Sequence, residues 1–466
     1  MATKPLRIAI IGSGLGGAVL ADLLAGHHDV AVFERGSVSP SRPAPPLMTA
    51  HPFGLYPSFA YGLGGTTNFW HGGLVEMLDD EMGPDWPDSL KRALPEYYPH
   101  VVLQLYGDGA LKAWRARDPV QSGGDLHLAQ LFYPPAPFRA AQSGFLSMAE
   151  LRMDHRVERL EERDDGVDVV SLFEGKTVTE RFDRAVIAAG GLNAPLLLQR
   201  SGLGGAQAGR NFTDHPMGFV AKLKASKPSQ AFLRLRGKGG LFARSQAVLK
   251  ARDGESGLWS AFYLRAGVGA GLASDPYARS FEFLAETTRG GKYRAALPHL
   301  RDPDFLWQAV ENQLGVQLPS SHAYVLVLNE QEATAQGTVR AAEHGGIAVD
   351  WNISEAVDAS IHRNLERLAD YTQSELILPE GPLRNRLWSA AHHSGTCRIS
   401  PNQATGVVDE ELRVHGTEHI YVCDGSVLPS TGASNTGLTI AALAHRLAAR
   451  LNKERGADIA PSKRGR

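Results

Sequence analysis

The fold is decided by the stretch Ile8-Ala9-Ile10-Ile11-Gly12-Ser13-Gly14-Leu15-Gly16-Gly17. Its first four residues are apolar, as in a parallel strand that is covered on both faces. Gly12 allows a tight turn out of that strand, and Gly14 lets the backbone approach a pyrophosphate with no Cβ in the way. Gly17 lets the next helix, expected over residues 18–25, lie close to the strand, and the helix N-terminus offers unpaired N–H groups to phosphates. The stretch therefore predicts a dinucleotide-binding turn.

An acidic residue completes this pattern at the end of the second expected strand. Val30-Ala31-Val32-Phe33 is followed directly by Glu34. A carboxylate at this position can accept hydrogen bonds from an adenosine ribose and selects against a 2′-phosphate. A glycine-rich turn alone is common and needs no ligand, but here the strand, turn, helix and acid occur together. We therefore predict that a dinucleotide binds at this turn.

The length, net charge and cysteine count of the chain exclude several other classes of protein. A chain of 466 residues is long enough for two or three domains, and its formal net charge of −2 gives no overall electrostatic case for nucleic acid or an acidic membrane. Its two cysteines, Cys397 and Cys423, support neither a disulfide framework nor a cysteine metal site, and no metal is expected. No apolar run approaches the roughly 20 residues that span a bilayer. The first strand begins too early to leave room for a signal peptide, so we expect a cytoplasmic protein.

Two further segments are expected to lie near the dinucleotide, and a third to cover it. Residues 61–73 contain five glycines interleaved with Thr, Asn, Trp and His, which is typical of backbone laid along a flat ligand rather than of a linker. Ala185-Val186-Ile187-Ala188-Ala189-Gly190-Gly191 is another buried strand running into glycines, with a helix expected over residues 194–200. Residues 220–387 contain longer half-buried strands and no glycine turn of the nucleotide type, which indicates a second domain.

The C-terminal part carries side chains suited to proton transfer. His392 and His393 precede a Gly-Thr turn, and Ser434-Asn435-Thr436-Gly437 opens a long helix expected over residues 438–451. That helix start could present N–H groups and positive potential to an electron-accepting ring. A neutral histidine near such a ring is a good base for an alcohol proton at physiological pH. By itself, a histidine pair in a loop is more often structural or solvated.

Taken together, the motifs resemble those of glucose–methanol–choline (GMC) flavin oxidoreductases along most of the chain. The shared motifs, in the family's order, are residues 12–17 with Glu34, 64–67, 188–195, 209–216, 392–396, 407–409 and 422–426 through Asn435. The flavin loop ending in Phe69-Trp70, with Asp85-Trp86-Pro87 after it, most resembles the branch of pyranose oxidases and gluconate dehydrogenase large subunits. The resemblance implies an α/β chain, α+β overall, in which a Rossmann-like FAD-binding domain is joined to a discontinuous antiparallel-sheet substrate domain.

The resemblance also implies how the chain is divided. The FAD-binding domain is expected to combine residues 1–75, 140–219 and 388–452, and the substrate-binding domain residues 76–139 and 220–387, with a disordered tail over 453–466.

The resemblance also implies roles for individual residues at the positions that match the family's motifs. His392 is implied to be the catalytic histidine because it stands three positions before the glycine of Gly-Thr, a spacing that His393 fits less well. Asn435 falls where the family has its second catalytic residue. Asp214-His215 is expected to support the interdomain surface in a structural role. The positions implied to contact the cofactor are Gly12, Ser13, Gly14, Leu15, Gly17, Glu34, Arg35, Gly64, Gly65, Thr66, Asn68, Phe69, Trp70, His71, Val157, Ala189, Gly190, Asp424, Gly425, Thr436 and Gly437.

These assignments predict an FAD-dependent oxidoreductase that oxidises the CH–OH group of a small alcohol, either a polyol or a sugar-like molecule. His392 would take the hydroxyl proton, Asn435 would hold the oxygen, and the hydride would go to flavin N5, with oxygen or another carrier as the final electron acceptor. Two alternatives remain: a non-redox FAD-containing lyase on the same fold, and a degenerate FAD-binding subunit. Bleaching of the flavin by an alcohol separates the first alternative from the oxidoreductase, and the His392/Asn435 pair argues against the second.

The first prediction concerns how FAD is held. Some relatives tether the flavin through a histidine of the glycine-rich loop, but Phe69 stands at that position here, so FAD is expected to bind noncovalently. Acid precipitation of the purified yellow protein should release free FAD into the supernatant, as measured by absorbance and chromatography. Flavin that stays with the precipitate would contradict this and would point to His71, two residues further on.

Overall fold

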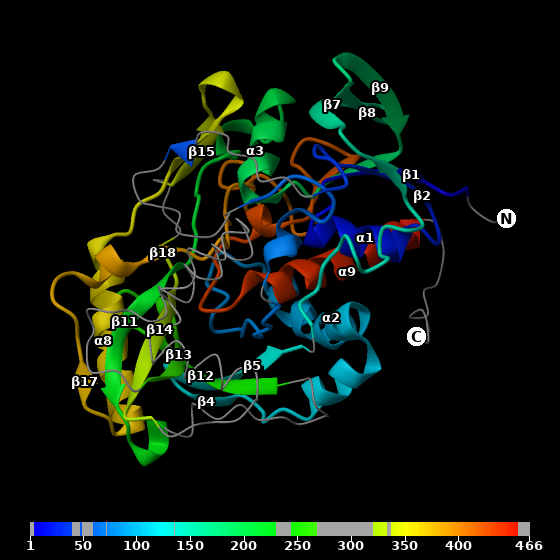
Figure 1. Cartoon of the computed structure of the whole chain (residues 1–466). Helices are drawn as coiled ribbons and strands as arrows, with labels where there is room; N and C mark the ends of the chain where they lie inside the picture. Colours follow the sequence, from blue (N-terminus) through cyan, green and yellow to red (C-terminus); the bar gives the residue numbers. More distant parts are fainter. Residues whose placement is uncertain are drawn as a thin grey trace, which may run out of the picture.

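The computed structural model describes residues 4–39, 47–48, 59–70, 72–134, 136–229, 244–267, 320–332 and 337–454. In this part of the chain the strands form a five-stranded sheet, an eight-stranded sheet and two three-stranded sheets. Figure 1 shows helices α1 and α9 side by side between the two larger sheets.

The five-stranded sheet is parallel throughout and has the order β19-β10-β1-β2-β6. Its strands are β1 (Arg7–Ile11), β2 (Asp29–Phe33), β6 (Glu150–Arg152), β10 (Arg184–Ile187) and β19 (Ile420–Val422). Because the carboxyl ends of parallel strands meet at one edge, the segments that follow β1, β2, β10 and β19 gather there. The expected α/β sheet is confirmed, and the motif residues 12–17 with Glu34, 188–195 and 422–426 lie at this one edge.

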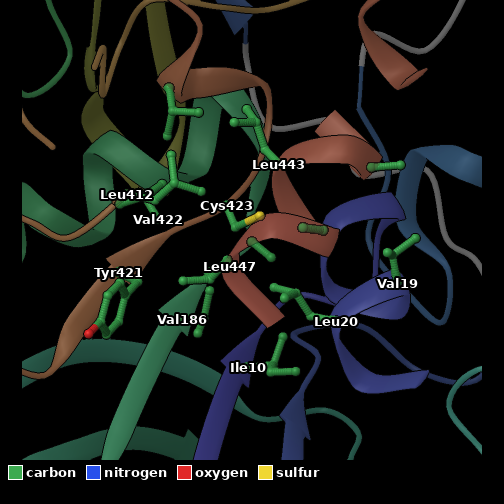
Figure 2. Close-up of a cluster of buried hydrophobic side chains, with 14 of the residues drawn as sticks. Ile10, Val19, Leu20, Val186, Leu412, Tyr421, Val422, Cys423, Leu443 and Leu447 are labelled. Carbon is green, nitrogen blue, oxygen red and sulfur yellow. The ribbon is translucent and has the colours of Figure 1, made fainter. Parts of the chain in front are cut away.

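Three helices share an apolar core with this sheet: α1 (Leu15–Leu24), α3 (Gly190–Arg200) and α9 (Thr436–Glu454). Helix α2 (Asp88–Arg115), which is broken by a non-helical Gly107, packs against α9. Figure 2 shows where the sheet, α1 and α9 meet in one buried cluster, which includes Ile10, Val186, Leu20 and Leu447. Each such side chain contributes about 1.5–3 kcal/mol on burial, so this contact fixes the start of α9 relative to the sheet edge.

The glycines of the first turn let backbone segments touch. A Cβ at Gly17 would lie 2.0 Å from the carbonyl oxygen of Gly12, and one at Gly16 would lie 2.2 Å from that of Cys423. Gly12 has φ +112°, a left-handed conformation that favours glycine. The close approach of α1 to β1 at Gly17 is as predicted, whereas the contact of Gly16 with the end of β19 could be seen only in the fold.

The eight-stranded sheet is antiparallel, with the order β17-β11-β14-β13-β12-β5-β4 and β18 paired to β11. Its strands are β4 (Gln121–Gly123), β5 (Leu126–Tyr133), β11 (Pro216–Lys224), β12 (Arg244–Arg252), β13 (Trp259–Gly267), β14 (His322–Asn329), β17 (Leu376–Ile377) and β18 (Trp388–Ser389). The sheet thus takes in β18 and part of β11, residues that the expected division gave to the cofactor domain.

The two faces of the antiparallel sheet meet different partners. Helix α8 (Glu355–Thr372) packs its buried residues, among them Ile361 and Leu365, on one face. The other face carries Tyr263 and Leu326, which cluster with Ala433 from the loop that leads into α9. The antiparallel sheet therefore reaches the functional edge of the parallel sheet through this loop.

The remaining elements are short. Strands β7 (Arg156–Arg163), β8 (Gly166–Phe173) and β9 (Lys176–Phe182) form the antiparallel excursion that the alternating sequence predicts. Strands β15 (Thr338–Ala341), β16 (Ile347–Asp350) and β3 (Leu47–Met48) form the other small sheet. The 3₁₀ turns are η1 (Gly65–Phe69), η2 (Gly205–Gln207), η4 (Glu343–Gly345), η5 (Leu383–Arg386) and η6 (Gly425–Val427).

Helix α9 includes Lys453 and Glu454, and the rest of the expected tail lies outside the described residues. Within the described ranges, none of the helices combines the length and apolar character needed to cross a bilayer.

The glycine contacts give a matched pair of variants. Gly17→Ala should destabilise the apoprotein by about 1–3 kcal/mol, because its methyl group would press on the Gly12 backbone even though alanine favours helices. Gly14→Ala should leave apoprotein stability nearly unchanged, since a Cβ there meets nothing within 4 Å. Denaturant unfolding of the two apoproteins is the measurement, and equal stabilities would show that close packing at Gly17 is unimportant.

Candidate active site

The edge formed by the ends of β1, β10 and β19 has an open backbone cradle. Positions beyond the Cα atoms of Gly14 and Gly190 are empty to 4 Å, and Gly14 is the N-cap of α1, with no side-chain hydrogen bond to cap the helix. Asp424 ties two strand ends together, because its Oδ2 accepts from the Gly190 N–H at 2.8 Å and its Oδ1 from the Ser426 N–H at 2.9 Å. A helix N-terminus without a side-chain cap beside open space suits a pyrophosphate, so the residues present fit the expected dinucleotide.

Glu34 is buried and already bound by the protein. Its Oε2 accepts from the Ser13 hydroxyl at 2.6 Å, and its Oε1 accepts from the N–H groups of Gly36 at 2.9 Å and Gly62 at 3.0 Å. The carboxylate therefore joins the first turn, the exit of β2 and the glycine-rich segment that precedes η1. A ribose hydroxyl at Glu34 would have to share or replace these donors.

The glycine-rich segment after residue 60 is held in shape by its own side chains and by Arg139. The Asn68 Nδ2 donates to the carbonyls of Leu63 and Gly65 at 2.9 and 3.0 Å. The Arg139 Nη1 donates to the carbonyl oxygens of Thr67 and Trp70 at 2.8 and 2.6 Å. Sequence reasoning missed Arg139, because nothing near it in the chain marks it as an anchor of this loop.

The aromatic end of this loop contacts the start of α9. A Cβ at Gly437 would lie 2.7 Å from Cζ2 of Trp70, so the indole rests on the first turn of that helix. Two groups implied to border the same cofactor are therefore brought together. Phe69 ends η1, whereas His71 lies outside the described residues.

The other implied cofactor positions lie in several different elements. Leu15 begins α1, Thr66 lies in η1, Ala189 caps α3, Gly425 begins η6 and Val157 is buried on β7.

Arg35 points to the glycine-rich segment. Its Nη1 donates to the Tyr61 hydroxyl at 2.9 Å, and the Tyr61 hydroxyl donates to Asn193 Oδ1 at 3.0 Å. Tyr61 and Asn193 thus link the ends of β2 and β10, a role that the sequence did not indicate.

His392 lies at the centre of a polar cluster between the two sheets. Its Nδ1 is 2.8 Å from Nδ1 of His215, and the two rings stand at 87°. The fully buried Asp214 accepts the backbone N–H of His392 at 2.9 Å and the hydroxyl of Ser389 at 2.5 Å. The residue before His392, Ala391, has φ +61°, a strained conformation that costs on the order of 1–3 kcal/mol.

The cluster includes Asp214 and His215, the two residues expected to support the interdomain surface. The fold brings both of them into contact with His392. The partner of His215 comes from a loop 177 residues further along the chain, so no local pattern could reveal the contact.

Burial keeps these histidines neutral. Burial lowers the pKa of His392 well below that of an ordinary histidine, and the neighbouring His215 and His393 act in the same direction. Burial also lowers the pKa of His215 to about 4 and that of His393 to about 3. Asp214 is affected in the opposite sense, because burial raises its pKa to about 7 despite the hydrogen bonds it accepts.

His393 packs away from His392. Its backbone oxygen lies 2.5 Å from where a Cβ at Gly191 would stand, and its ring faces Phe212 with the centroids 5.7 Å apart. Its Nε2 is 3.6 Å from Asp214 Oδ2, which is longer than a hydrogen bond.

Asn435 stands directly before α9 and connects to the histidines through its own loop. Its Oδ1 accepts weakly from the Tyr263 hydroxyl at 3.4 Å. Three residues earlier, the carbonyl oxygen of Gly432 lies 2.8 Å from Nε2 of His215. The chain His392–His215–Gly432 thus links the two predicted catalytic residues.

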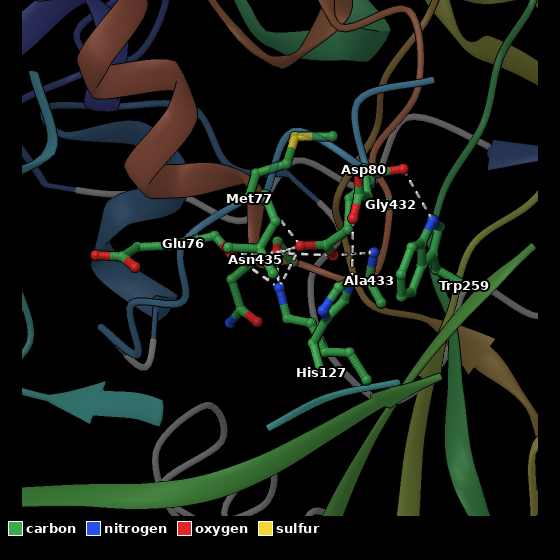
Figure 3. A network of polar contacts seen from close by, with 12 residues as sticks. Glu76, Met77, Asp80, His127, Trp259, Gly432, Ala433 and Asn435 are labelled. Carbon is green, nitrogen blue, oxygen red and sulfur yellow. Dashed lines mark hydrogen bonds and ion pairs between the residues drawn. The ribbon is translucent and has the colours of Figure 1, made fainter. Parts of the chain in front are cut away.

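A buried ion pair fixes the loop before Asn435 (Figure 3). Lys250 Nζ and Glu81 Oε2 are 2.5 Å apart, and both side chains are fully buried. Lys250 also donates to the Ser434 hydroxyl at 2.6 Å, while Glu81 Oε1 accepts the Ala433 N–H at 2.9 Å.

A second buried acidic side chain, that of Glu330, holds the same loop. It accepts the N–H groups of Gly432 at 3.1 Å and Trp259 at 3.2 Å, and burial raises its pKa to about 8. Sequence reasoning missed Glu81, Lys250 and Glu330. In the described part of the chain, no group of three or more His, Cys, Asp or Glu side chains is arranged to hold a metal ion.

Comparison with known proteins agrees with the fold and the motifs. Family models described as GMC oxidoreductase match residues 145–217 and 335–444, which confirms the predicted resemblance to this family. An uncharacterised GMC-type oxidoreductase of Sinorhizobium fredii is 24% identical over 504 aligned positions, which cover 94% of this chain and 93% of that protein.

Two pyridoxine 4-oxidases are also similar. The one from Microbacterium luteolum is 26% identical over 287 residues, which cover 56% of this chain and 49% of that protein, so the match spans about half the length of this relative. The crystal structure of the one from Mesorbium loti aligns with a TM-score of 0.57 and 15% identity, over 96% of this chain and 99% of that one. This structural likeness concerns the fold.

The buried ion pair leads to a stability prediction. Lys250→Met should destabilise the protein by about 3–5 kcal/mol, because it leaves the Glu81 carboxylate buried without its cation. The double variant Lys250→Met/Glu81→Gln should recover part of that loss, since no charge then remains buried. Lys224→Met, which breaks an exposed pair with Glu375 at 3.5 Å, is the control and should cost under about 1 kcal/mol. Denaturant unfolding is the measurement, and equal losses in Lys250→Met and Lys224→Met would contradict the prediction.

Proposed function

We propose that this chain is an FAD-dependent oxidoreductase that oxidises the CH–OH group of a small alcohol, with His392 as the general base. The observation that carries the proposal is a half-buried, neutral His392 linked through His215 and Gly432 to the loop of Asn435. A base held neutral near neutral pH can accept an alcohol proton. The similarity to pyridoxine 4-oxidase and to a long-chain-alcohol oxidase of Arabidopsis thaliana supports an alcohol as the substrate.

The cofactor assignment rests on the open cradle at the sheet edge. Gly12, Gly14 and the start of α1 would bind the pyrophosphate, Glu34 would face the ribose, and the η1 loop would lie along the flavin. Bound FAD supplies the hydride acceptor of the reaction. Because Phe69 stands where a tethering histidine would be, we propose noncovalent binding.

At the alcohol, His392 and Asn435 have separate roles. His392 takes the hydroxyl proton on a ring nitrogen. Asn435 Oδ1 accepts from Tyr263, so its Nδ2 is the group that can donate to the substrate oxygen. We propose a polyol or sugar-like alcohol, following the resemblance of the flavin loop to the pyranose oxidase branch, and oxygen or another carrier as the electron acceptor.

Replacing the predicted catalytic residues tests this function. His392→Ala should slow flavin reduction by about 10²–10⁴-fold, the usual contribution of a positioned general base, with the bound-FAD spectrum nearly unchanged. His393→Ala should cost much less, because that side chain packs toward α3, and Asn435→Ala should fall between the two. Anaerobic rapid mixing with a panel of alcohols is the measurement.

Each contrary outcome has a definite meaning. If flavin reduction is slow in His393→Ala and near normal in His392→Ala, the general base is His393, one residue further on. Flavin that no alcohol bleaches would favour a non-redox lyase on this fold.

The same reaction should depend on pH in one direction. Protonated imidazole cannot accept the hydroxyl proton, so the rate of flavin reduction should fall as the pH drops through the pKa of His392. Because burial lowers that pKa, the fall should lie on the acid side of the ordinary value of about 6.5. Reduction rates measured from about pH 4 to 8 test this, and a fall centred above 7 would mean that another group controls the step.

A further inference from the structure

A directed chain of hydrogen bonds runs from the candidate base to a backbone carbonyl. His392 Nδ1 is 2.8 Å from His215 Nδ1, and His215 Nε2 is 2.8 Å from the carbonyl oxygen of Gly432. The His215 side chain is fully buried. Both of its nitrogens are therefore committed to these two partners.

The carbonyl sets the direction of the chain. A carbonyl oxygen can only accept, so His215 must carry its proton on Nε2 and donate it to Gly432. Burial keeps His215 neutral, and a neutral imidazole holds one N–H proton, so its Nδ1 is an acceptor. For the 2.8 Å contact to be a hydrogen bond, His392 must then donate from Nδ1. A neutral His392 with a proton on Nδ1 has its lone pair on Nε2.

We propose that His215 is a positioning residue that fixes His392 in the Nδ1–H tautomer and so presents Nε2 as the proton acceptor. This inference rests on the proposed function, in which His392 is the base. An imidazole with the opposite tautomer would offer an N–H to the alcohol and could not take its proton. In other enzymes, loss of the group that sets a catalytic histidine's tautomer has lowered turnover by about 10⁴-fold.

The surroundings hold His215 in this role. Asp214 Oδ1 accepts the backbone N–H of His215 at 2.7 Å and that of His392 at 2.9 Å, so one carboxylate sets both backbones. Gly432 is held in turn through its N–H by Glu330. The charges of Glu81 and Lys250 act on His215 in opposite directions, the first favouring and the second opposing its protonation. Burial remains the largest influence, and His215 stays neutral.

Two substitutions at the same position separate the two hydrogen bonds. His215→Asn can place an amide oxygen where Nδ1 stands and so keeps an acceptor for His392. His215→Gln can place an amide N–H where Nε2 stands and so keeps the bond to Gly432 but loses that acceptor. We expect flavin reduction within about tenfold of wild type in His215→Asn, and slower by about 10²–10⁴-fold in His215→Gln.

A spectroscopic measurement reports the tautomer without turnover. In holoenzyme labelled with ¹⁵N-histidine, the signals that vanish in His392→Ala belong to His392. They should show a protonated Nδ1 and a bare Nε2 in wild type and in His215→Asn. In His215→Gln they should show a larger share of the Nε2–H form than in wild type.

The outcomes separate this inference from the proposed function. If His392→Ala is slow but both His215 variants reduce flavin at the wild-type rate, the role of His215 is wrong and the base remains. A wild-type signal with the proton on Nε2 of His392 would also overturn it. If His392→Ala itself is near wild type, the proposed function fails, and the ¹⁵N signals still decide which tautomer His215 selects.

Discussion

The buried pair of Lys250 and Glu81 is the interaction on which the geometry of the site depends. Lys250 belongs to the antiparallel sheet, Glu81 precedes α2, and both bind the loop that leads into α9. Two charges taken out of water are stable only with close geometry and further hydrogen bonds. In this loop those bonds are made to Ala433 and Ser434, so desolvation of the pair holds the loop in one position. Asn435 and the carbonyl that binds His215 follow from it.

Around this fixed loop, burial in low-polarity surroundings determines the pKa values of the ionisable side chains. Exclusion of water lowers the pKa values of His392, His215 and His393 and raises those of Asp214 and Glu330. Neutral imidazoles can form a directed chain, because each has one donor and one acceptor. The backbone carbonyl at the end of the chain gives it its direction. Burial keeps the imidazoles neutral, and the fixed carbonyl determines which nitrogen carries the proton. Together they would leave the lone pair of the candidate base available to the substrate.

Much of the cofactor-side architecture could be predicted from the sequence because it depends on local rules. Apolar runs ending in glycine predict buried parallel strands, and Gly12 and Gly17 are required where two backbones nearly touch. The resemblance to a known family, through the spacing of His392 to the Gly-Thr turn, picked out the histidine that the fold brings against His215. The roles of Arg139, Lys250 and Glu330 could not be predicted, because each depends on partners far away in the chain.

The sequence by itself determined the parallel sheet and the glycine turn at its edge, since strand and turn patterns act over a few residues. The candidate pair His392 and Asn435 came from the resemblance of the sequence motifs to those of a known family. The tertiary structure alone decided which groups surround that pair. His215 reaches His392 across 177 positions, and Lys250 reaches Glu81 across 169. Contacts at such separations arise from packing of the two sheets. This packing buries the polar groups, which must then bind each other because water is excluded.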